Sequence, residues 1–363
     1  MVKEKYIILT GSKNNAGDFL IKRKTISLLQ RLRKDRDVVS YDAWKPLTSS
    51  VINEINNSKA LILAGGPSLQ TNMYPNIYNL TNNLDHITVP IVTMGIGSKH
   101  HDYTENGYKN YFLSSQSIKL LEKINNNFIS SVRDDFTLNI LKQYGFNNFI
   151  NTGCSVLFQN DSRQYKKENN SNVYFSLGVS YKYSLKMMAQ MKIVISYLKN
   201  KYNIIVLLHH EINVNDKRLL EILGWLKFND IKYHDISGDS SELINFYSNC
   251  YFHIGYRVHA HMFCLSIGKP SILLAEDSRG TGLNETVSSS VLRSYSPREI
   301  NLITRLKLKL NLECDLFQVN NDLMRMIDNE IDSNIFSKSK QNIVNIQIAE
   351  RFKLMKRFCD QLP

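Results

Sequence analysis

The stretch that decides the fold is Lys5-Tyr-Ile-Ile-Leu-Thr-Gly-Ser-Lys-Asn-Asn-Ala-Gly-Asp18, which is followed by the amphipathic segment 19–32. Residues 5–10 are apolar and rich in β-forming side chains, so they predict a buried strand. Residues 11–18 form a loop that contains two glycines, and segment 19–32 has the apolar spacing of a helix. This order of strand, loop and helix opens a βαβ unit.

Further apolar runs extend the same pattern through the first half of the chain. Strands are expected at residues 60–64, 89–94, 128–132 and 148–151, with a helix from about residue 134. Glycines follow the first two of these strands, namely Gly65, Gly66, Gly95 and Gly97. Strands that end on glycine loops mark the edge where α/β sheets bind ligands.

A polar stretch without apolar periodicity, residues 161–171, is the expected linker. Beyond it, strands are predicted at residues 173–179, 204–208, 231–234, 251–254 and, as the last strand, 271–274, with helices at 183–202, 216–227, 241–248 and 259–266. We therefore predict an α/β protein with two Rossmann-like domains, 1–160 and 172–296, facing across a cleft. A helical tail, 297–363, is expected to pack back on the first domain.

The composition is that of a folded protein that attracts anions. The chain has 363 residues, 43% of them hydrophobic and 21% charged, with a net charge of +12. Half of this excess lies in residues 1–60, which contain 12 Lys and Arg against 6 Asp and Glu. The five cysteines are odd in number and widely spaced, which suggests neither a disulfide framework nor a zinc knuckle. With no apolar run of membrane-spanning length, we expect a cytoplasmic protein.

The loop Gly11 to Asp18 is the first candidate site. It joins a strand to a helix, where backbone N–H groups and the helix dipole can hold an anion or a sugar hydroxyl. It matches neither a Walker loop nor the Gly-x-Gly-x-x-Gly spacing. The competing interpretation is an ordinary tight turn in which Asp18 caps the helix.

Arg133, in Ser131-Val-Arg-Asp-Asp135, is the second candidate, because it stands between a predicted strand and a helix. From that place its guanidinium can present a bidentate fork to a carboxylate or phosphate in the cleft. The competing interpretation is a surface ion pair with Asp134 or Asp135.

The most informative stretch is His253-Ile-Gly-Tyr-Arg-Val-His-Ala-His261. Arg257, His259 and the N–H of Val258 fall on a strand-to-helix turn, where they can converge on one anion beside an imidazole able to pass a proton. The alternatives are a polar pair at a helix start and a zinc site, although two-residue spacing splays the rings and no carboxylate joins them. His209-His210-Glu211 ends another strand and reads as a polar loop, whereas Arg279 is a candidate third cation.

Taken together, these motifs resemble the polysaccharide pyruvyl transferase family over residues 5–282. The features that match are Asn15-Ala-Gly-Asp18, Leu61-Ile-Leu-Ala-Gly-Gly66, Met94-Gly-Ile-Gly97, Ser131-Val-Arg-Asp134, Gly255-Tyr-Arg-Val-His259 and Gly268-Lys-Pro270. The resemblance implies a GT-B-like fold and transfer of a pyruvyl group from phosphoenolpyruvate to two sugar hydroxyls, giving a ketal. The chain departs from the family at Arg279, where a lysine is common, and at Thr152-Gly-Cys-Ser155, which replaces a Thr-x-Asp-Pro context.

The resemblance also implies roles for individual residues. Arg133, Arg257 and Val258 would hold phosphoenolpyruvate, with Arg279 as a further donor-binding residue and His259 as general acid. The acceptor, a sugar or lipid-linked oligosaccharide, is expected at the first domain's loops, at Asn15, Gly17, Asp18, Gly65 and Gly66. No metal and no cofactor besides the co-substrate are expected.

Two other functions stay open on the sequence alone. One is a glycosyltransferase of the same fold that uses a nucleotide-activated sugar, and the other is a non-catalytic envelope-assembly or binding protein. Nucleic acid is not an expected partner, because there is no basic run interleaved with aromatics. The basic first helix predicts peripheral contact with an anionic membrane, at the inner face of the cytoplasmic membrane.

Overall fold

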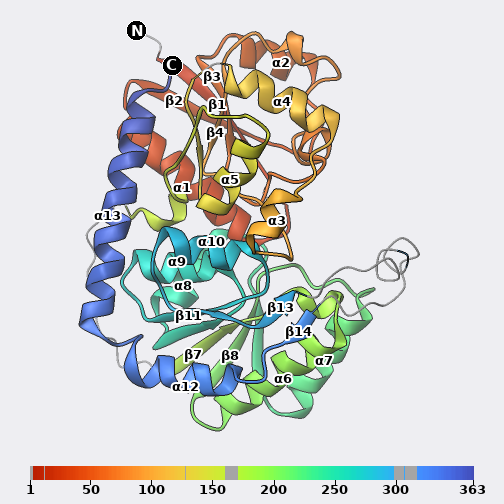
Figure 1. Ribbon diagram of the computed structural model, residues 1–363, viewed down its shortest axis with the longest axis vertical. Helices are drawn as coiled ribbons and strands as arrows, with labels where there is room; N and C mark the ends of the chain where they lie inside the picture. The colour runs from red at the N-terminus through yellow and green to blue at the C-terminus, as the bar shows by residue number, and fades with distance from the viewer. Residues whose placement is uncertain (1–2, 12, 127, 160–170, 298–305, 307–316) are drawn as a thin grey trace.

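The computed structural model describes residues 3–11, 13–126, 128–159, 171–297, 306 and 317–363. They form two halves, each built on a parallel β-sheet, with a long C-terminal helix beside both (Figure 1). The predicted α/β class with two parallel sheets and a helical C-terminal end is confirmed. The expected linker falls almost wholly on residues 160–170, which lie outside the described residues.

The first sheet has the strand order β2-β1-β3-β4, and every neighbouring pair is parallel. Its strands are β1 (Glu4–Thr10), β2 (Arg36–Asp42), β3 (Ala60–Ala64) and β4 (Ile91–Met94). A parallel pair, β5 (Ser130–Val132) and β6 (Phe149–Asn151), adjoins β4 through a bridge between Ile96 and Val132. The helices of this half are α1 (Ala16–Leu32), α2 (Ser49–Asn56), α3 (Glu105–Lys109), α4 (Ser115–Asn125) and α5 (Asp135–Gln143).

The second sheet has the order β12-β11-β10-β7-β8-β9 and is parallel throughout. Its strands are β7 (Asn172–Ser176), β8 (Asn203–Leu208), β9 (Lys232–Asp235), β10 (Phe252–Gly255), β11 (Ser271–Ala275) and β12 (Val291–Arg293). Its helices are α6 (Leu185–Lys199), α7 (Lys217–Phe228), α8 (Ser240–Ser248), α9 (Val258–Ser266) and α10 (Ser278–Thr286). The prediction that 271–274 is the last strand was wrong, because β12 pairs beside it.

Local capping explains where two helices depart from the predicted boundaries. Helix α1 begins at Ala16 rather than at residue 19, because Asn15 accepts a hydrogen bond from the Gly17 N–H. Helix α6 begins at Leu185 rather than at 183, because the Ser184 hydroxyl accepts from the Met187 N–H. Asn15 is therefore the N-cap of α1, and Asp18 lies in its first turn instead of capping it.

The C-terminal segment joins the two halves. Strand β14 (Phe317–Val319) pairs antiparallel with β13 (Tyr295–Pro297), and α12 (Leu323–Ser333) and α13 (Lys338–Asp360) follow. Helix α13 runs along the side of the molecule (Figure 1). It contacts the second half where Gln347 accepts from the Ser288 N–H (2.7 Å) and the first half where Arg351 donates to the Asn151 carbonyl (3.0 Å).

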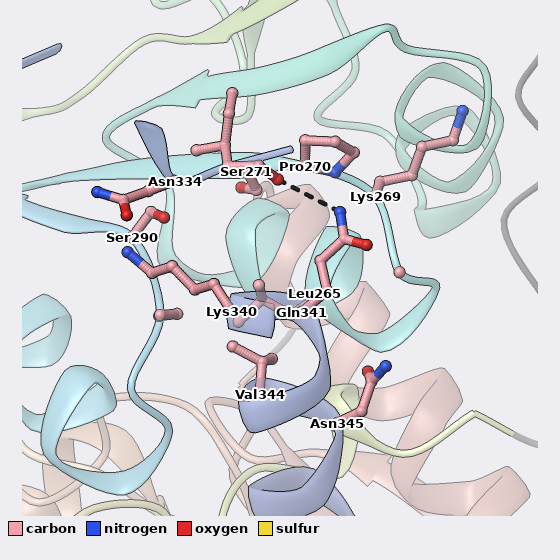
Figure 2. A pocket seen from close by; sticks show the side chains of 13 residues that line it. Leu265, Lys269, Pro270, Ser271, Ser290, Asn334, Lys340, Gln341, Val344 and Asn345 are labelled. Carbon is pink, nitrogen blue, oxygen red and sulfur yellow. Dashed lines mark hydrogen bonds between the residues drawn. The ribbon is translucent and has the colours of Figure 1, made fainter. Parts of the chain in front are cut away.

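A small cavity lies where α13 begins, against the turn between α9 and β11 (Figure 2). Leu265, Pro270 and Val344 contribute apolar walls, and the Gln341 amide donates to the Ile335 carbonyl at 3.3 Å. The volume of about 40 Å³ has room for a few water molecules at most. We therefore regard it as a packing feature of the α13 junction.

Several cations of the basic helix α1 are occupied in internal contacts. Lys24 donates to the Gln159 side chain (2.8 Å), Arg31 to the Gln159 carbonyl (2.9 Å) and Arg33 to the Leu362 carbonyl (2.8 Å). These charges bind the end of the first half and the C-terminal residues. Contact between α1 and an anionic membrane stays a prediction. Among the described residues, no helix is both long and apolar enough to cross a bilayer.

Candidate functional site

The loop before α1 connects the two halves at the cleft. The Asn15 amide donates to a carboxylate oxygen of Asp18 (2.9 Å), which fixes this carboxyl group at the start of the helix. The Ala16 N–H donates to the His209 carbonyl at the end of β8 (3.0 Å), and the Glu211 N–H donates back to the Asn14 carbonyl (3.3 Å). The segment His209-His210-Glu211, which the sequence analysis interpreted as a polar loop, therefore holds the predicted acceptor loop in place.

Arg133 lies at the end of β5 and is only 1% exposed. Its Nε donates to Asp134 (3.1 Å) and its Nη2 to the Ser98 carbonyl (3.1 Å), whereas Nη1 has no partner among the described residues. The ion pair with Asp134, which the sequence analysis gave as a surface alternative, does form, but it is buried. A Cβ on Gly97 would come within 2.1 Å of the Arg133 Nε, so glycine is needed there for the guanidinium to fit.

Arg257 is the N-cap residue of α9, and hydrogen bonds hold both its backbone and its side chain. Its N–H donates to the Ser176 hydroxyl (3.0 Å) and its Nε to the Leu177 carbonyl (2.7 Å). Burial lowers the pKa of this guanidinium from its usual value. Val258 is the first residue of the helix, so its N–H has no partner within α9 and is placed to receive an anion.

His259 comes one residue later and faces the first half of the chain. Its imidazole packs against Gly17, where a Cβ would come within 2.7 Å of Nδ1. The ring is 6% exposed, and its Nε2 has no hydrogen-bond partner among the described residues. Burial, followed by the charges of Arg133, Arg279 and Arg257, holds the pKa of His259 well below its ordinary value. Without a bound anion the ring is neutral, whereas the general-acid role requires the imidazolium.

Arg279, the third predicted cation, is already paired. Its Nε and Nη2 form a bidentate ion pair with the two carboxylate oxygens of Asp277, at 2.8 and 2.6 Å. Glu276 lies 3.8 Å away, and its carboxylate accepts from the backbone N–H groups of Val179 and Ser180. Arg279 therefore lies beside two carboxylates, whereas Arg133 pairs with the single carboxylate of Asp134.

Asp18 is the group on which these charges converge. Burial raises the pKa of its carboxyl to about 6, opposed by the Asn15 amide and by Arg279, Arg133 and Arg257. Because all three arginines act on this one carboxyl, the structure brings the predicted donor side and the predicted acceptor side into one site. An acid with such a pKa can give or take a proton near neutral pH.

Asp18 also lines a cavity of about 190 Å³ at the ends of β1 and β3. Gly65 and Gly66, two of the predicted acceptor residues, form part of its wall. Both have positive φ, 54° and 72°, a conformation that favours glycine. Asn15 and Gly17 do not line this cavity: Asn15 orients Asp18, and Gly17 makes room for His259.

Sequence reasoning missed Lys99, which follows β4 in the loop that begins at Gly95. Burial, and then the charge of Arg279, lowers the pKa of its ammonium group, and Asp277 and Glu276 oppose this. It is therefore a fourth cation at the same cleft. The available signal was its place in the glycine-containing loop after a predicted strand, the edge at which α/β sheets bind ligands.

The histidines considered for zinc have other partners. His253 hydrogen-bonds the hydroxyls of Ser176 (2.9 Å) and Ser271 (2.7 Å), and His261 those of Ser271 (2.6 Å) and Ser289 (2.9 Å). His259 points instead to Gly17. In the part of the chain that the structure describes, no three His, Cys, Asp or Glu side chains gather as they would around a metal.

Solved structures share this architecture at low sequence identity. UDP-GlcNAc 2-epimerase from Neisseria meningitidis, bound to UDP-GlcNAc, superposes with a TM-score of 0.52 at 11% identity, over 98% of this chain and 99% of that one. A ugt transferase from Siraitia grosvenorii in complex with UDP gives 0.51 at 10% identity, over 99% and 100%. These likenesses show a GT-B-like fold.

No curated protein matches the sequence. The family model for polysaccharide pyruvyl transferase, in contrast, matches residues 15–278. This range runs from Asn15, the cap of α1, to Ser278, the first residue of α10, and includes Arg133, Arg257 and His259. The protein therefore belongs to the polysaccharide pyruvyl transferase family, a family of transferases.

Proposed function

We propose that the protein transfers a pyruvyl group from phosphoenolpyruvate to two hydroxyls of a sugar in a cell-surface polysaccharide precursor. The observation that carries this proposal is the convergence of Arg133, Arg257 and His259 on the cleft, with a guanidinium nitrogen and an imidazole nitrogen that are buried and unpaired. Buried polar atoms are rarely left without partners, and a ligand's oxygens would supply them. A small, highly charged anion fits this arrangement.

The donor would bind across the two halves. Arg133 offers its Nη1 from the first half, and Arg257 and the Val258 N–H lie on the second half. Several fixed cations in a site of reduced dielectric suit a substrate that carries both a phosphate and a carboxylate. Arg279, neutralised in part by Asp277, and the partly buried Lys99 would contribute at longer range.

The protonation of His259 would follow from donor binding. Burial and then three guanidinium groups disfavour the imidazolium in the free protein, and the negative charges of phosphoenolpyruvate would oppose both effects. His259 then protonates the enol methylene, which makes C2 electrophilic. The acid would thus become active only when its substrate is present.

The remaining steps need a base at the acceptor. The carboxylate of Asp18 accepts the proton of the first sugar hydroxyl as its oxygen bonds to C2. Phosphate then leaves C2, and a second hydroxyl of the same sugar closes the ketal. The protons balance over the reaction. The proton of one sugar hydroxyl replaces the proton that His259 gave to the methylene carbon, and the proton of the other hydroxyl leaves with phosphate.

The test is release of inorganic phosphate from phosphoenolpyruvate in the presence of sugar or lipid-linked acceptors. We expect release that depends on both substrates and is lost in His259→Gln. Turnover of a nucleotide sugar in place of phosphoenolpyruvate would identify a glycosyltransferase instead. Binding of phosphoenolpyruvate with no turnover across the acceptors would favour a binding protein.

A further inference from the structure

A second and larger hollow lies on the first half of the chain, beside the cavity at Asp18. Its volume is about 420 Å³, within the range of small-molecule sites, about 300–1,000 Å³. Gln70 and Ile77 line both hollows, so the two hollows adjoin at these side chains. A ligand seated at Asp18 could therefore continue past Gln70 and Ile77 into the larger hollow.

The lining of the larger hollow is rich in side-chain amides. Asn72 and Asn76 are exposed, and their amides form no hydrogen bond with the described protein. The Nε2 of Gln70 donates to the Pro67 carbonyl (2.6 Å), which leaves its amide oxygen to face a ligand. Each amide offers both donors and an acceptor, the combination that a sugar hydroxyl matches.

Two aromatic rings complete the lining. Tyr111 is buried and fixed by its hydroxyl, which donates to the Leu69 carbonyl (2.7 Å). Phe112 lines the hollow and is 68% exposed, so its ring is accessible to a ligand seated there. A ring of this kind can stack on the C–H face of a pyranose while the amides bind its hydroxyls.

The charges of the hollow decide between a sugar and a nucleotide. None of its described lining residues carries a carboxylate or a guanidinium, and its one lysine, Lys99, stands toward the cleft charges of Arg279 and Asp277. A nucleoside diphosphate would bring two phosphates to a lining whose described residues hold amides, Lys99 and His100 but no arginine. Uncharged hydroxyls match the same lining.

We infer that the larger hollow binds a neutral sugar residue adjoining the one that is pyruvylated, so that the acceptor is an oligosaccharide of at least two units. This inference rests on the proposed function, which places the reacting sugar at Asp18. The Asn72 and Asn76 amides bind the hydroxyls of the second sugar, and Phe112 covers its apolar face.

The experiment measures binding of defined sugars to the full-length protein by saturation-transfer NMR titration. The probes are di- and trisaccharides of glucose, galactose and N-acetylglucosamine, each beside the methyl glycoside of its component sugar. We expect at least one oligosaccharide to bind about five- to tenfold more tightly than its monosaccharide. Phe112→Ala or Asn76→Ala should remove this gain and leave monosaccharide binding unchanged, whereas Phe112→Trp should retain it.

Phe228→Ala is the matched control, because Phe228 is 89% exposed on α7 and lies outside both hollows. The inference is overturned if no oligosaccharide gains affinity, if Phe112→Ala weakens mono- and oligosaccharides alike, or if uridine diphosphate binds and depends on Phe112. Because the titration contains no phosphoenolpyruvate, its result is independent of turnover. A Phe112-dependent gain together with no phosphate release would reject the proposed reaction and keep the sugar site.

Discussion

His259 and His261 stand two residues apart on α9, yet they lie in opposite environments. His261 is fully buried, and both its ring nitrogens hydrogen-bond serine hydroxyls inside the second half. His259 turns to the first half, packs on Gly17 and keeps an unpaired buried nitrogen. The arginines differ in degree, since Asp277 binds Arg279 in a bidentate ion pair, whereas Arg133 contacts Asp134 through Nε and keeps a buried Nη1 without a partner among the described residues. At the cleft, a buried nitrogen without a partner in the described part of the chain therefore marks the side chains that are available to a ligand.

Exchanging the two histidines for glutamine tests this contrast most strongly. His259→Gln should reduce phosphoenolpyruvate-dependent turnover about 1,000-fold, because it removes the proton donor. His261→Gln should keep the turnover of the folded enzyme and lower the free energy of unfolding by about 1–3 kcal/mol. Phosphate release and urea unfolding measure the two effects. Equal loss of turnover in both folded variants would contradict the division.

The arginines offer the next largest difference. Arg133→Lys should lower kcat/KM for phosphoenolpyruvate about 100-fold, because a single ammonium cannot hold Asp134, the Ser98 carbonyl and the donor together. Arg279→Lys should lower it less than about tenfold, because Asp277 already compensates this charge. Steady-state kinetics on the two variants gives the comparison. A greater loss at Arg279 would show that the ion pair opens to receive the donor.

The fold and much of the site could be predicted from sequence because the decisive signals are local. Apolar runs such as residues 60–64, followed by glycines, favour buried strands, and Arg133, Arg257 and His259 stand in the turns and first helical residues that follow strands. Helix α10 was missed because Gly280 and Gly282 lower its helix propensity. These glycines fit close packing, since a Cβ at Gly282 would come within 3.0 Å of Asp134.

Other features depend on contacts between the halves and have no local signal. The pKa of Asp18 depends on its burial in the folded chain and on Arg279 and Arg257 of the other half, which oppose the rise, and the pairing of Arg279 requires the geometry of the turn after β11. The amide-lined hollow gathers residues from 70–77, 99–100 and 110–112, which no spacing rule connects.

Ionisation of Asp18 should lower the free energy of unfolding of the protein. With a pKa of about 6 in the folded state and about 4 when unfolded, the buried carboxylate destabilises the protein above pH 6 by about 1–3 kcal/mol. Asp18→Asn should therefore raise Tm at pH 8 and lose this advantage near pH 3, where the carboxyl group is mostly protonated in both states. It should also lower turnover about 100-fold. Thermal unfolding at the two pH values measures the first effect, and an unchanged Tm at pH 8 would contradict it.

The smallest expected effect is the pH dependence of stability that arises from the buried histidines His253 and His261. Burial keeps the pKa of His261 at about 3 and that of His253 well below its ordinary value, whereas both protonate near pH 6.5 once unfolded. The unfolded state thus binds more protons below pH 6.5, so stability falls as the pH drops, by about 1.4 kcal/mol per pH unit for each histidine. Urea unfolding between pH 7.5 and 5.5 should show this slope. His261→Gln should make it shallower, and an unchanged slope would assign the effect to other groups.

Helix α13 has a consequence for how the protein comes apart. Since it is bonded to Ser288 in one half and Asn151 in the other, neither half can melt without releasing the helix that covers its neighbour. The two sheets should consequently lose structure in one cooperative transition. In scanning calorimetry this appears as a single peak whose calorimetric and van't Hoff enthalpies agree, although the chain is built on two sheets.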